Sequence, residues 1–218
     1  MLYELRTYFA PPGKMPALIR HMEVAAGIFP KHGLNALGYW IDEVGTSNQI
    51  TYMWMYESEA ARHKSLASFR ADFDWRSHSA EEEKQHGMIV ERTHSVLMQA
   101  TPYSPQPKPF GKLLELRVYD VVPGKMQALN DRFANHTMGI FNQHGVHSIG
   151  YWTEVFGTSN RLVYMLAYES LAAREKNWGG FLVDKNWQRI RAETELAGPI
   201  VSKIHNRLLR PTAYSPTA

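Results

Sequence analysis

Two short segments of this chain repeat one set of side chains that could bind and polarise a small molecule. Each alternates a glutamate, an arginine and a tyrosine: Glu4, Arg6 and Tyr8 in the first, and Glu115, Arg117 and Tyr119 in the second. A guanidinium is a permanent cation whose N–H groups suit an anion or a carbonyl oxygen, and a tyrosine hydroxyl can act as acid or base. We therefore predict that the two arginines bind substrate and that the two tyrosines are catalytic. The structural alternative is that each arginine only neutralises a buried glutamate.

A histidine followed by a glycine ends the first predicted helix of each half. His32 and His144 occupy these positions. Histidine is the commonest general base, so we predict catalytic roles for both residues. A cation is also favoured at the C-terminal end of a helix, which gives the structural alternative of a simple helix cap.

Aromatic residues supply the apolar part of the predicted site. We predict that Trp40, Tyr56 and Trp152 bind substrate, because aromatic rings bury a large area and a tyrosine adds a polar group. The alternative is an ordinary sheet core. Trp54 of the first half is replaced by Leu166 in the second. The two halves therefore differ, as they would if one carried the functional site and the other a structural relic.

The composition excludes several kinds of chemistry and of partner. The chain has no cysteine, which removes disulfides, thiolate metal sites and thiol nucleophiles. It has no HExxH motif, phosphate loop or dinucleotide fingerprint, so we predict no metal and no cofactor. The net charge of +3 comes from scattered residues, so nucleic acid is not an expected partner. No run of about 18 apolar residues occurs, so we expect no membrane partner.

The compartment and the assembly are predicted from coarser signals. Strand-like sequence begins at Leu2, without a basic and apolar leader before it. Together with the absence of cysteine, this start favours a cytoplasmic protein. We also expect a homo-oligomer.

The chain is built from two copies of one unit. Glu4 and Glu115 lie 111 residues apart, and after one inserted residue Gly38 and Gly150 lie 112 apart. A long constant offset with matched residue types indicates a duplicated domain. We predict one domain over residues 1–100, a proline-rich linker over 101–111 and a second domain over 112–218.

Within each copy the hydrophobic pattern predicts the order strand, helix, strand, strand, helix, strand. The predicted strands are Leu2–Phe9, Leu37–Val44, Gln49–Tyr56 and Met88–Met98 in the first copy, and Leu113–Val121, Ser148–Phe156, Arg161–Tyr168 and Ile200–Leu209 in the second. This is the ferredoxin-like order of an α+β fold, with a four-stranded antiparallel sheet and helices on one face.

The first strand has two unlike faces. Tyr3, Leu5 and Thr7 share one face, and the glutamate, arginine and tyrosine of the repeated set share the other. We expect the first face to pack on the helices of the same copy and the second to point toward the other sheet. Two such sheets facing each other would form a dimeric α/β barrel within one chain.

Several spaced motifs resemble the NIPSNAP family, and each occurs twice. In the first copy they are YELRTY at Tyr3–Tyr8, PGK at Pro12–Lys14, HG at His32-Gly33 and GYW…GTSN over Gly38–Asn48. One departure is the family's Asp-Pro-Glu-Trp-like segment, which reads Asp72–Trp75 (DFDW) and Asp184–Trp187 (DKNW) here. The resemblance implies the dimeric α/β-barrel fold and no particular reaction. Relatives of that fold include cofactor-free monooxygenases, isomerases, lactonases and haem-binding enzymes, so haem is the alternative to no cofactor.

Two functions remain open from these observations. The first is a small-molecule binder or enzyme that acts on an apolar or carbonyl-bearing ligand, by cofactor-free proton transfer or oxygenation. The alternative is a non-catalytic interaction or scaffold protein whose aromatic residues only fill a core. A cavity above about 300 Å³ that holds arginine, tyrosine and histidine favours the first, and a filled interior favours the second.

Overall fold

The computed structural model describes residues 1–108 and 111–216 of the chain. They form two compact units. Of the described residues, the first unit contains Met1–Met98 and residues 211–216, and the second contains residues 99–108 and 111–210. Within the described residues, no helix is long and apolar enough to cross a membrane.

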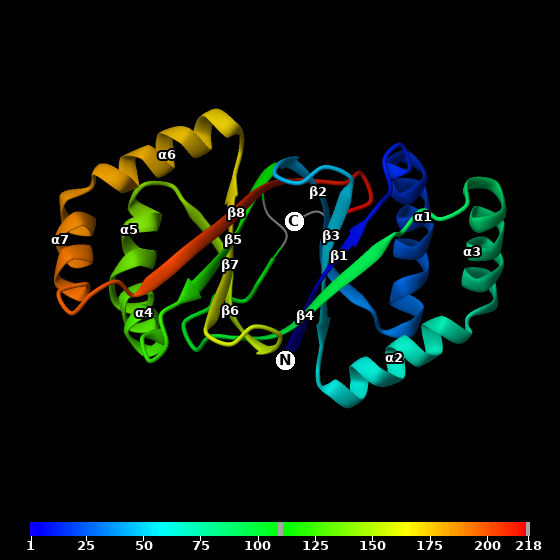
Figure 1. Cartoon of the computed structure of the whole chain (residues 1–218), viewed down its shortest axis with the longest axis horizontal. Helices are drawn as coiled ribbons and strands as arrows, with labels where there is room; N and C mark the ends of the chain where they lie inside the picture. Colours follow the sequence, from blue (N-terminus) through cyan, green and yellow to red (C-terminus); the bar gives the residue numbers. More distant parts are fainter. Residues whose placement is uncertain (109–110, 217–218) are drawn as a thin grey trace. The chain divides into compact units, whose positions relative to one another are not determined.

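The first unit places its helices on one face of an antiparallel sheet (Figure 1). Its elements are β1 (Leu2–Phe9), α1 (Met15–Ile28), the 3₁₀ helix η1 (Phe29–His32), β2 (Asn35–Val44), β3 (Gln49–Tyr56), α2 (Glu59–Ala71), α3 (Phe73–His86) and β4 (Arg92–Ala100). Strand β1 pairs with β4 on one side and with β3 on the other, and β3 pairs with β2. The spatial order β4–β1–β3–β2 is ferredoxin-like.

The second unit repeats this arrangement. Its elements are β5 (Leu113–Val121), α4 (Met126–Arg132), the π-helical segment η2 (Phe133–Thr137), α5 (Met138–Gln143), β6 (His147–Phe156), β7 (Arg161–Tyr168), α6 (Leu171–Val183), α7 (Lys185–Thr194) and β8 (Val201–Pro211). Strand β5 pairs with β8 and β7, and β7 pairs with β6. The predicted fold class is therefore confirmed, as α+β with two tandem ferredoxin-like repeats.

The two faces of β1 are used in the opposite way to the prediction. Arg6 lies opposite Tyr52 of β3, whose ring belongs to the core cluster formed with helices α1 and α2. Arg62 of α2 donates hydrogen bonds of 2.7 and 2.9 Å to Glu4. The glutamate, arginine and tyrosine therefore face the helices of their own unit, and the expectation that they face a second sheet is wrong. A charged strand face can pack on helices here because α2 supplies a matching cation.

The one-residue insertion in the second copy becomes a π-helical turn. In the first unit the corresponding helix runs without interruption over Met15–Ile28. In the second unit the offset changes from 111 to 112 between Leu129 and Gly139, and the π-helical residues Phe133–Thr137 lie within that stretch. A π turn accommodates one added residue in a helix and is frequent at functional sites. The insertion therefore reshapes one helix wall of the second unit.

Each unit is completed by a Thr-x-Tyr-Ser-Pro segment. In the second unit Ser104 accepts a hydrogen bond of 2.9 Å from the backbone N–H of Tyr151. In the first unit Ser215 accepts one of 3.0 Å from the backbone N–H of Tyr39. The segment after β4 thus belongs to the unit of β5–β8, and the segment after β8 belongs to the unit of β1–β3.

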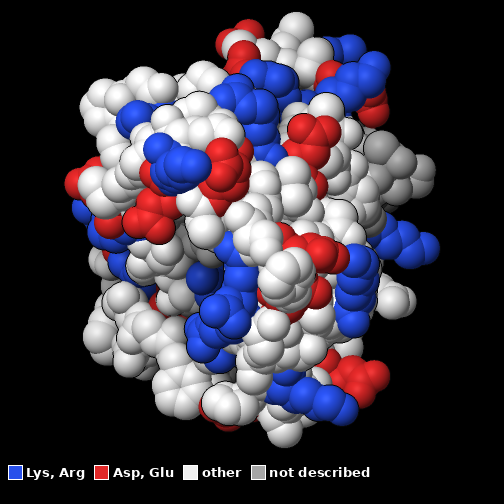
Figure 2. Space-filling view, turned by 90° about the vertical axis from the view of Figure 1, so that its right-hand side faces the viewer, with Lys and Arg blue, Asp and Glu red and all other residues white. Residues whose placement is uncertain are grey.

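Charged residues of both signs are interspersed on one face of the molecule (Figure 2). Figure 2 shows lysine and arginine side chains lying among aspartate and glutamate side chains, without one basic field covering that face.

Candidate small-molecule site

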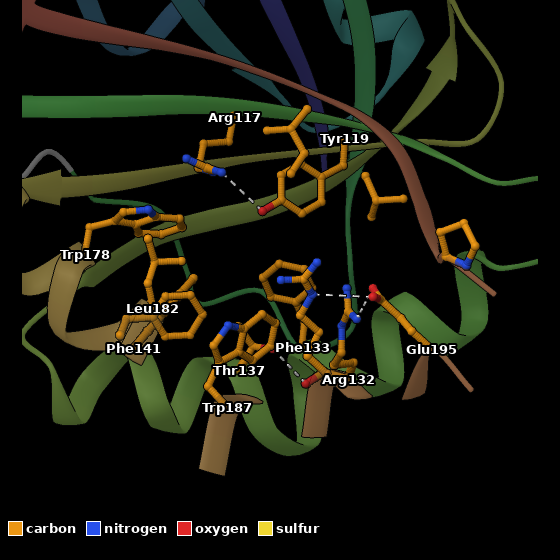
Figure 3. Close-up of a pocket in the computed structure, with 15 residues that line it drawn as sticks. Arg117, Tyr119, Arg132, Phe133, Thr137, Phe141, Trp178, Leu182, Trp187 and Glu195 are labelled. Carbon is orange, nitrogen blue, oxygen red and sulfur yellow. Dashed lines mark hydrogen bonds and ion pairs between the residues drawn. The ribbon is translucent and has the colours of Figure 1, made fainter. Parts of the chain in front are cut away.

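A cavity of about 330 Å³ lies between the sheet and the helices of the second unit. Strand β5 contributes Arg117 and Tyr119, and the helices contribute most of the remaining wall (Figure 3). The other residues that line it are Arg132, Phe133, Thr137, Phe141, Trp178, Phe181, Leu182, Trp187, Arg191, Glu195, Pro199, Val201 and Ile204. Its size and mixed lining suit a small, mainly apolar ligand with a few polar groups.

Aromatic rings in mutual contact form the apolar wall. The ring of Phe181 lies 4.7 Å from that of Phe141 and 4.7 Å from that of Trp187, measured between centroids. Phe133, in the π-helical turn, packs 5.3 Å from Tyr164 of β7. These rings hold one another in fixed orientations, so the wall offers a preformed surface for a planar ligand.

Arg117 is the central polar group of the site. It is almost fully buried and donates hydrogen bonds to the hydroxyl of Tyr164 at 2.8 Å, to the carboxylate of Glu115, and to the hydroxyl of Tyr119 at 3.3 Å. Its guanidinium carbon lies 4.3 Å from the centre of the Trp178 ring, a cation–π contact. These contacts hold the cation in one orientation at the edge of the cavity.

The carboxylate of Glu115 is the counter-ion of Arg117. It is fully buried and accepts hydrogen bonds from Arg117, from Nε and Nη2 of Arg174, and from Asn206. Burial alone would raise the pKa of Glu115, but the hydrogen bonds and positive charges of the two arginines outweigh it and lower the pKa. Burial would likewise lower the pKa of Arg117, yet Tyr164, Tyr119 and Glu115 raise it. The pair is therefore ionised, and Arg117 is a permanent cation.

Tyr119 presents the hydroxyl best placed for a ligand. Its oxygen accepts a hydrogen bond from Arg117, and its ring lies on the cavity wall. A hydroxyl that accepts from a cation becomes a stronger donor, because hydrogen bonds in a chain polarise one another. Arg117 and Tyr119 together can therefore hold a carbonyl oxygen and stabilise negative charge that develops on it.

The sequence did not predict the two further arginines of the cavity, Arg132 and Arg191. Arg132 of α4 is buried, donates a hydrogen bond of 2.8 Å to Glu195 and lies 5.4 Å from the Trp187 ring centre. Trp178, Phe133 and the other helix residues of the wall were also not predicted. The signals were present in the sequence, because the offset changes near Phe133 and the second copy has Arg132 where the first has His21.

The first unit keeps the strand chemistry and changes the helix wall. Arg6 donates to Tyr52 at 2.9 Å, to Glu4 at 3.0 Å and to Tyr8 at 3.4 Å, as Arg117 does with its own partners. At the position of Arg132, however, His21 contacts His78 at 3.2 Å between ring nitrogens.

A tryptophan and a leucine have also changed places between the copies. Trp54 on β3 and Leu66 on α2 correspond to Leu166 on β7 and Trp178 on α6. The indole that contacts the arginine therefore comes from the strand in the first unit, 5.2 Å from Arg6. In the second unit the indole comes from the helix.

The two predicted catalytic histidines lie outside the residues that line this cavity. His144 contacts the carboxylate of Asp184 at 2.9 Å, and His32 contacts that of Asp72 at 2.9 Å. Each aspartate also caps the helix that follows it by accepting a backbone N–H bond, from Trp187 in one unit and from Trp75 in the other. In each Asp-x-x-Trp segment, the aspartate therefore caps a helix at the backbone of the tryptophan. This structural role does not depend on the two middle residues.

The remaining predicted residues divide into two groups. Tyr56 belongs to the arginine network, since its hydroxyl donates to Glu4 at 3.2 Å, and burial raises its pKa. Trp40 and Trp152 are buried on the sheet face opposite the helices, because their neighbours in sequence, Tyr39 and Tyr151, join the helix-side core clusters. The structure thus brings arginine, tyrosine and glutamate together and keeps these two tryptophans apart from them.

Residues 1–108 and 111–216 contain no group of three or more histidine, aspartate or glutamate side chains arranged to hold a metal ion. The polar side chains that line the cavity include three arginines, one tyrosine, one threonine and one glutamate: Arg117, Arg132, Arg191, Tyr119, Thr137 and Glu195.

The fold places this chain in a structural class that includes proteins described as monooxygenases or as oxidase-like. A proposed monooxygenase from Fusobacterium nucleatum is similar in structure, with a TM-score of 0.66 at 12% identity. The similarity covers 96% of this chain and 91% of that protein. An anthrone oxidase-like protein is similar over 100% of this chain and 93% of its own, with a TM-score of 0.60 at 11% identity. These likenesses establish a fold like that of the dimeric α/β-barrel proteins.

The family is established by sequence. The NIPSNAP family model matches residues 3–105 and again residues 114–216. Protein NipSnap homolog 3A from Homo sapiens is 24% identical over 218 residues, which cover 99% of this chain and 85% of that protein. A NipSnap homolog from Dictyostelium discoideum is 24% identical over 180 residues, covering 79% and 72%. The chain belongs to the NIPSNAP family, whose members have no established specific activity.

Proposed function

We propose that the second unit binds a small aromatic or otherwise apolar carbonyl compound in the cavity beside Arg117. One observation carries this proposal: a cavity of about 330 Å³ in which an aromatic wall meets a fixed cation and the Tyr119 hydroxyl. The scaffold alternative calls for a filled interior, which this cavity does not match. The cavity holds arginine and tyrosine but no histidine, so Tyr119 takes the role of proton donor.

The proposed chemistry needs no cofactor. Tyr119 donates a hydrogen bond to the carbonyl oxygen of the ligand. When the C–H bond next to the carbonyl group breaks and its proton passes to water, Arg117 stabilises the negative charge that the resulting enolate or phenolate carries on that oxygen. Such a form is the electron-rich species from which proton transfer or reaction with oxygen proceeds. Anthrone, named in one structural neighbour, is a polycyclic aromatic ketone and belongs to the ligand class that this cavity favours.

Binding is tested with 2-acetonaphthone, a planar aromatic ketone, by isothermal titration and by quenching of tryptophan fluorescence. We expect one site for each chain and a rise in the unfolding temperature with ligand concentration. Tyr119→Phe should weaken binding about threefold to tenfold, the value of one neutral hydrogen bond. Tyr8→Phe is the matched control from the first unit and should leave the affinity unchanged. Failure of aromatic ketones to bind, or equal affinity in Tyr119→Phe, contradicts the proposal.

An oxygen electrode separates an enzyme from a binder. With anthrone as the probe, an oxygenase consumes oxygen, releases water and forms anthraquinone faster than buffer alone. We expect Tyr119→Phe to slow this reaction and Tyr8→Phe to leave it unchanged. Binding without oxygen consumption or proton exchange would assign the site to a carrier or sensor.

We also propose a cytoplasmic location and self-association. The absence of cysteine suits a reducing compartment, and cell fractionation tests the location. The end of strand β6 exposes Val155 and Phe156, apolar side chains that a second copy could cover. Light scattering during gel filtration tests for self-association, with Phe156→Ser as the comparison.

A further inference from the structure

Arg132 forms a second polar end of the cavity, separate from Arg117. The two arginines come from different walls, one from strand β5 and the other from helix α4, with the aromatic residues between them (Figure 3). A ligand that fills the cavity therefore meets a cation at both ends. This argument rests on the proposed function of the same cavity.

The side chain of Arg132 is incompletely satisfied within the part of the chain that the structure describes. It is only 5% exposed, and its Nε atom is buried without a hydrogen-bond partner there. Its Nη1 atom binds Glu195 and Thr194, at 2.8 and 3.3 Å. Buried N–H groups are nearly always paired, and one that is not points to a missing acceptor.

Arg132 shares its counter-ion with a second arginine, Arg191, whose side chain is 64% exposed. Glu195 accepts a hydrogen bond from Arg132 through one oxygen and one of 3.4 Å from Arg191 through the other. One carboxylate therefore serves two arginines, just as Glu115 serves Arg117 and Arg174. An anion in the cavity would add a second negative charge beside Arg132, where burial makes the interaction strong.

We propose that Arg132 binds the carboxylate of an amphipathic aromatic acid whose carbonyl group is held at the other end by Arg117 and Tyr119. The arrangement is particular to the second unit, because the first has His21 at the corresponding position. There the imidazole already meets His78 at 3.2 Å. Arg132 is thus a specificity-determining residue, and the duplicated unit supplies its natural comparison.

The test compares two probes of the same shape, 6-acetyl-2-naphthoate and its neutral carboxamide. Isothermal titration should show that the wild-type chain binds the carboxylate about tenfold to a hundredfold more tightly, the range of a charge-assisted hydrogen bond. Arg132→Gln should weaken binding of the carboxylate much more than binding of the carboxamide, and so abolish this preference. Arg132→Lys, which keeps the charge, should retain part of the preference, and His21→Gln should retain all of it.

The outcomes distinguish this inference from the proposed function. Equal affinity of wild type for both probes, or a preference that survives in Arg132→Gln, overturns the role of Arg132 while the ketone site stands. Failure of the carboxamide and of 2-acetonaphthone to bind overturns both. Binding of the carboxamide by Arg132→Gln also shows that the variant is folded.

Discussion

Arg174 of helix α6 donates hydrogen bonds of 2.9 and 3.0 Å to the two carboxylate oxygens of Glu115 in strand β5. The pair ties the helix that carries Trp178 to the strand that carries Arg117. One wall of the cavity is therefore fixed relative to its central cation. Arg62 and Glu4 form the same link in the first unit.

Loss of this buried carboxylate should destabilise the protein strongly. In Glu115→Gln the buried Arg117 and the partly exposed Arg174 lose their counter-charge, so we expect the free energy of unfolding to fall by about 3 kcal/mol. Urea unfolding measures the change. Glu193→Gln removes the partner of Arg189 in an ion pair that is more than half exposed on both sides, and should cost less than about 1 kcal/mol. Similar costs for the two variants would show that the buried network contributes little.

The Gly-Tyr-Trp motif needs its glycine for packing. A Cβ atom on Gly150 would lie 2.5 Å from the Trp152 ring, and one on Gly38 would lie 2.3 Å from the Trp40 ring. Gly150→Ala should therefore lower the free energy of unfolding by about 1–3 kcal/mol, the usual cost of overpacking. Gly139→Ala is the control, because its Cβ would meet nothing within 4 Å in helix α5. That variant should raise stability by about 0.5–1 kcal/mol. A neutral Gly150→Ala would mean that the tryptophan ring can move aside.

His21 should make the first unit sensitive to acid. The pKa of His21 falls from 6.5 to about 4, because burial lowers it and, as a second cause, the charge of His78 lowers it as well. The negative charge of Glu82 raises this pKa by a smaller amount. The unfolded state therefore binds more protons between these values, so stability falls as the pH drops from 6.5 toward 4. The fall attributable to His21 is about 3 kcal/mol.

Urea unfolding across this pH range measures the effect. In His21→Gln the stability should decline less steeply with acid than in the wild type. His63→Gln, at an exposed position of α2, should show the wild-type slope. Parallel curves for all three proteins would contradict a depressed pKa at His21.

The Thr-x-Tyr-Ser-Pro segments should contribute equally to the two units. Ser104→Ala leaves the N–H of Tyr151 without its acceptor, and Ser215→Ala does the same to Tyr39. Each should cost about 1–3 kcal/mol of unfolding free energy, because an unsatisfied buried N–H is expensive. Ser202→Ala, which removes an exposed hydrogen bond to Asp120, should change stability by less than about 0.5 kcal/mol. Thermal unfolding that is unchanged in the first two variants would show that water replaces these serines.

The duplication of the chain and the alternation of side chains along β1 and β5 could be predicted from the sequence. Which face of those strands packs on the helices could not. Alternation separates Glu4, Arg6 and Tyr8 from their neighbours, but it does not say which face meets the helices. The partner that makes the charged face compatible with burial is Arg62, about 60 positions away in a helix of modest apolar character. Such a pairing is a tertiary contact that periodicity does not encode.

Within the site, the strand residues were predicted and the helix residues were missed. Arg117 and Tyr119 stand out because a motif repeats them, whereas Arg132 and Trp178 stand out only where the copies differ. The duplication identifies only the residues that the two halves share. The cavity wall was shaped by what they do not share, including the residue inserted at the π-helical turn.

The most direct measurement is the position of a bound ketone in a crystal of the chain soaked with 6-bromo-2-acetonaphthone. The bromine gives an anomalous peak that does not depend on any assumption about the ligand's pose. Our account predicts the peak inside the cavity of the second unit, with the ketone oxygen within hydrogen-bond distance of Tyr119. A fully occupied peak elsewhere, with this cavity empty at a ligand concentration that saturates binding in solution, would contradict it.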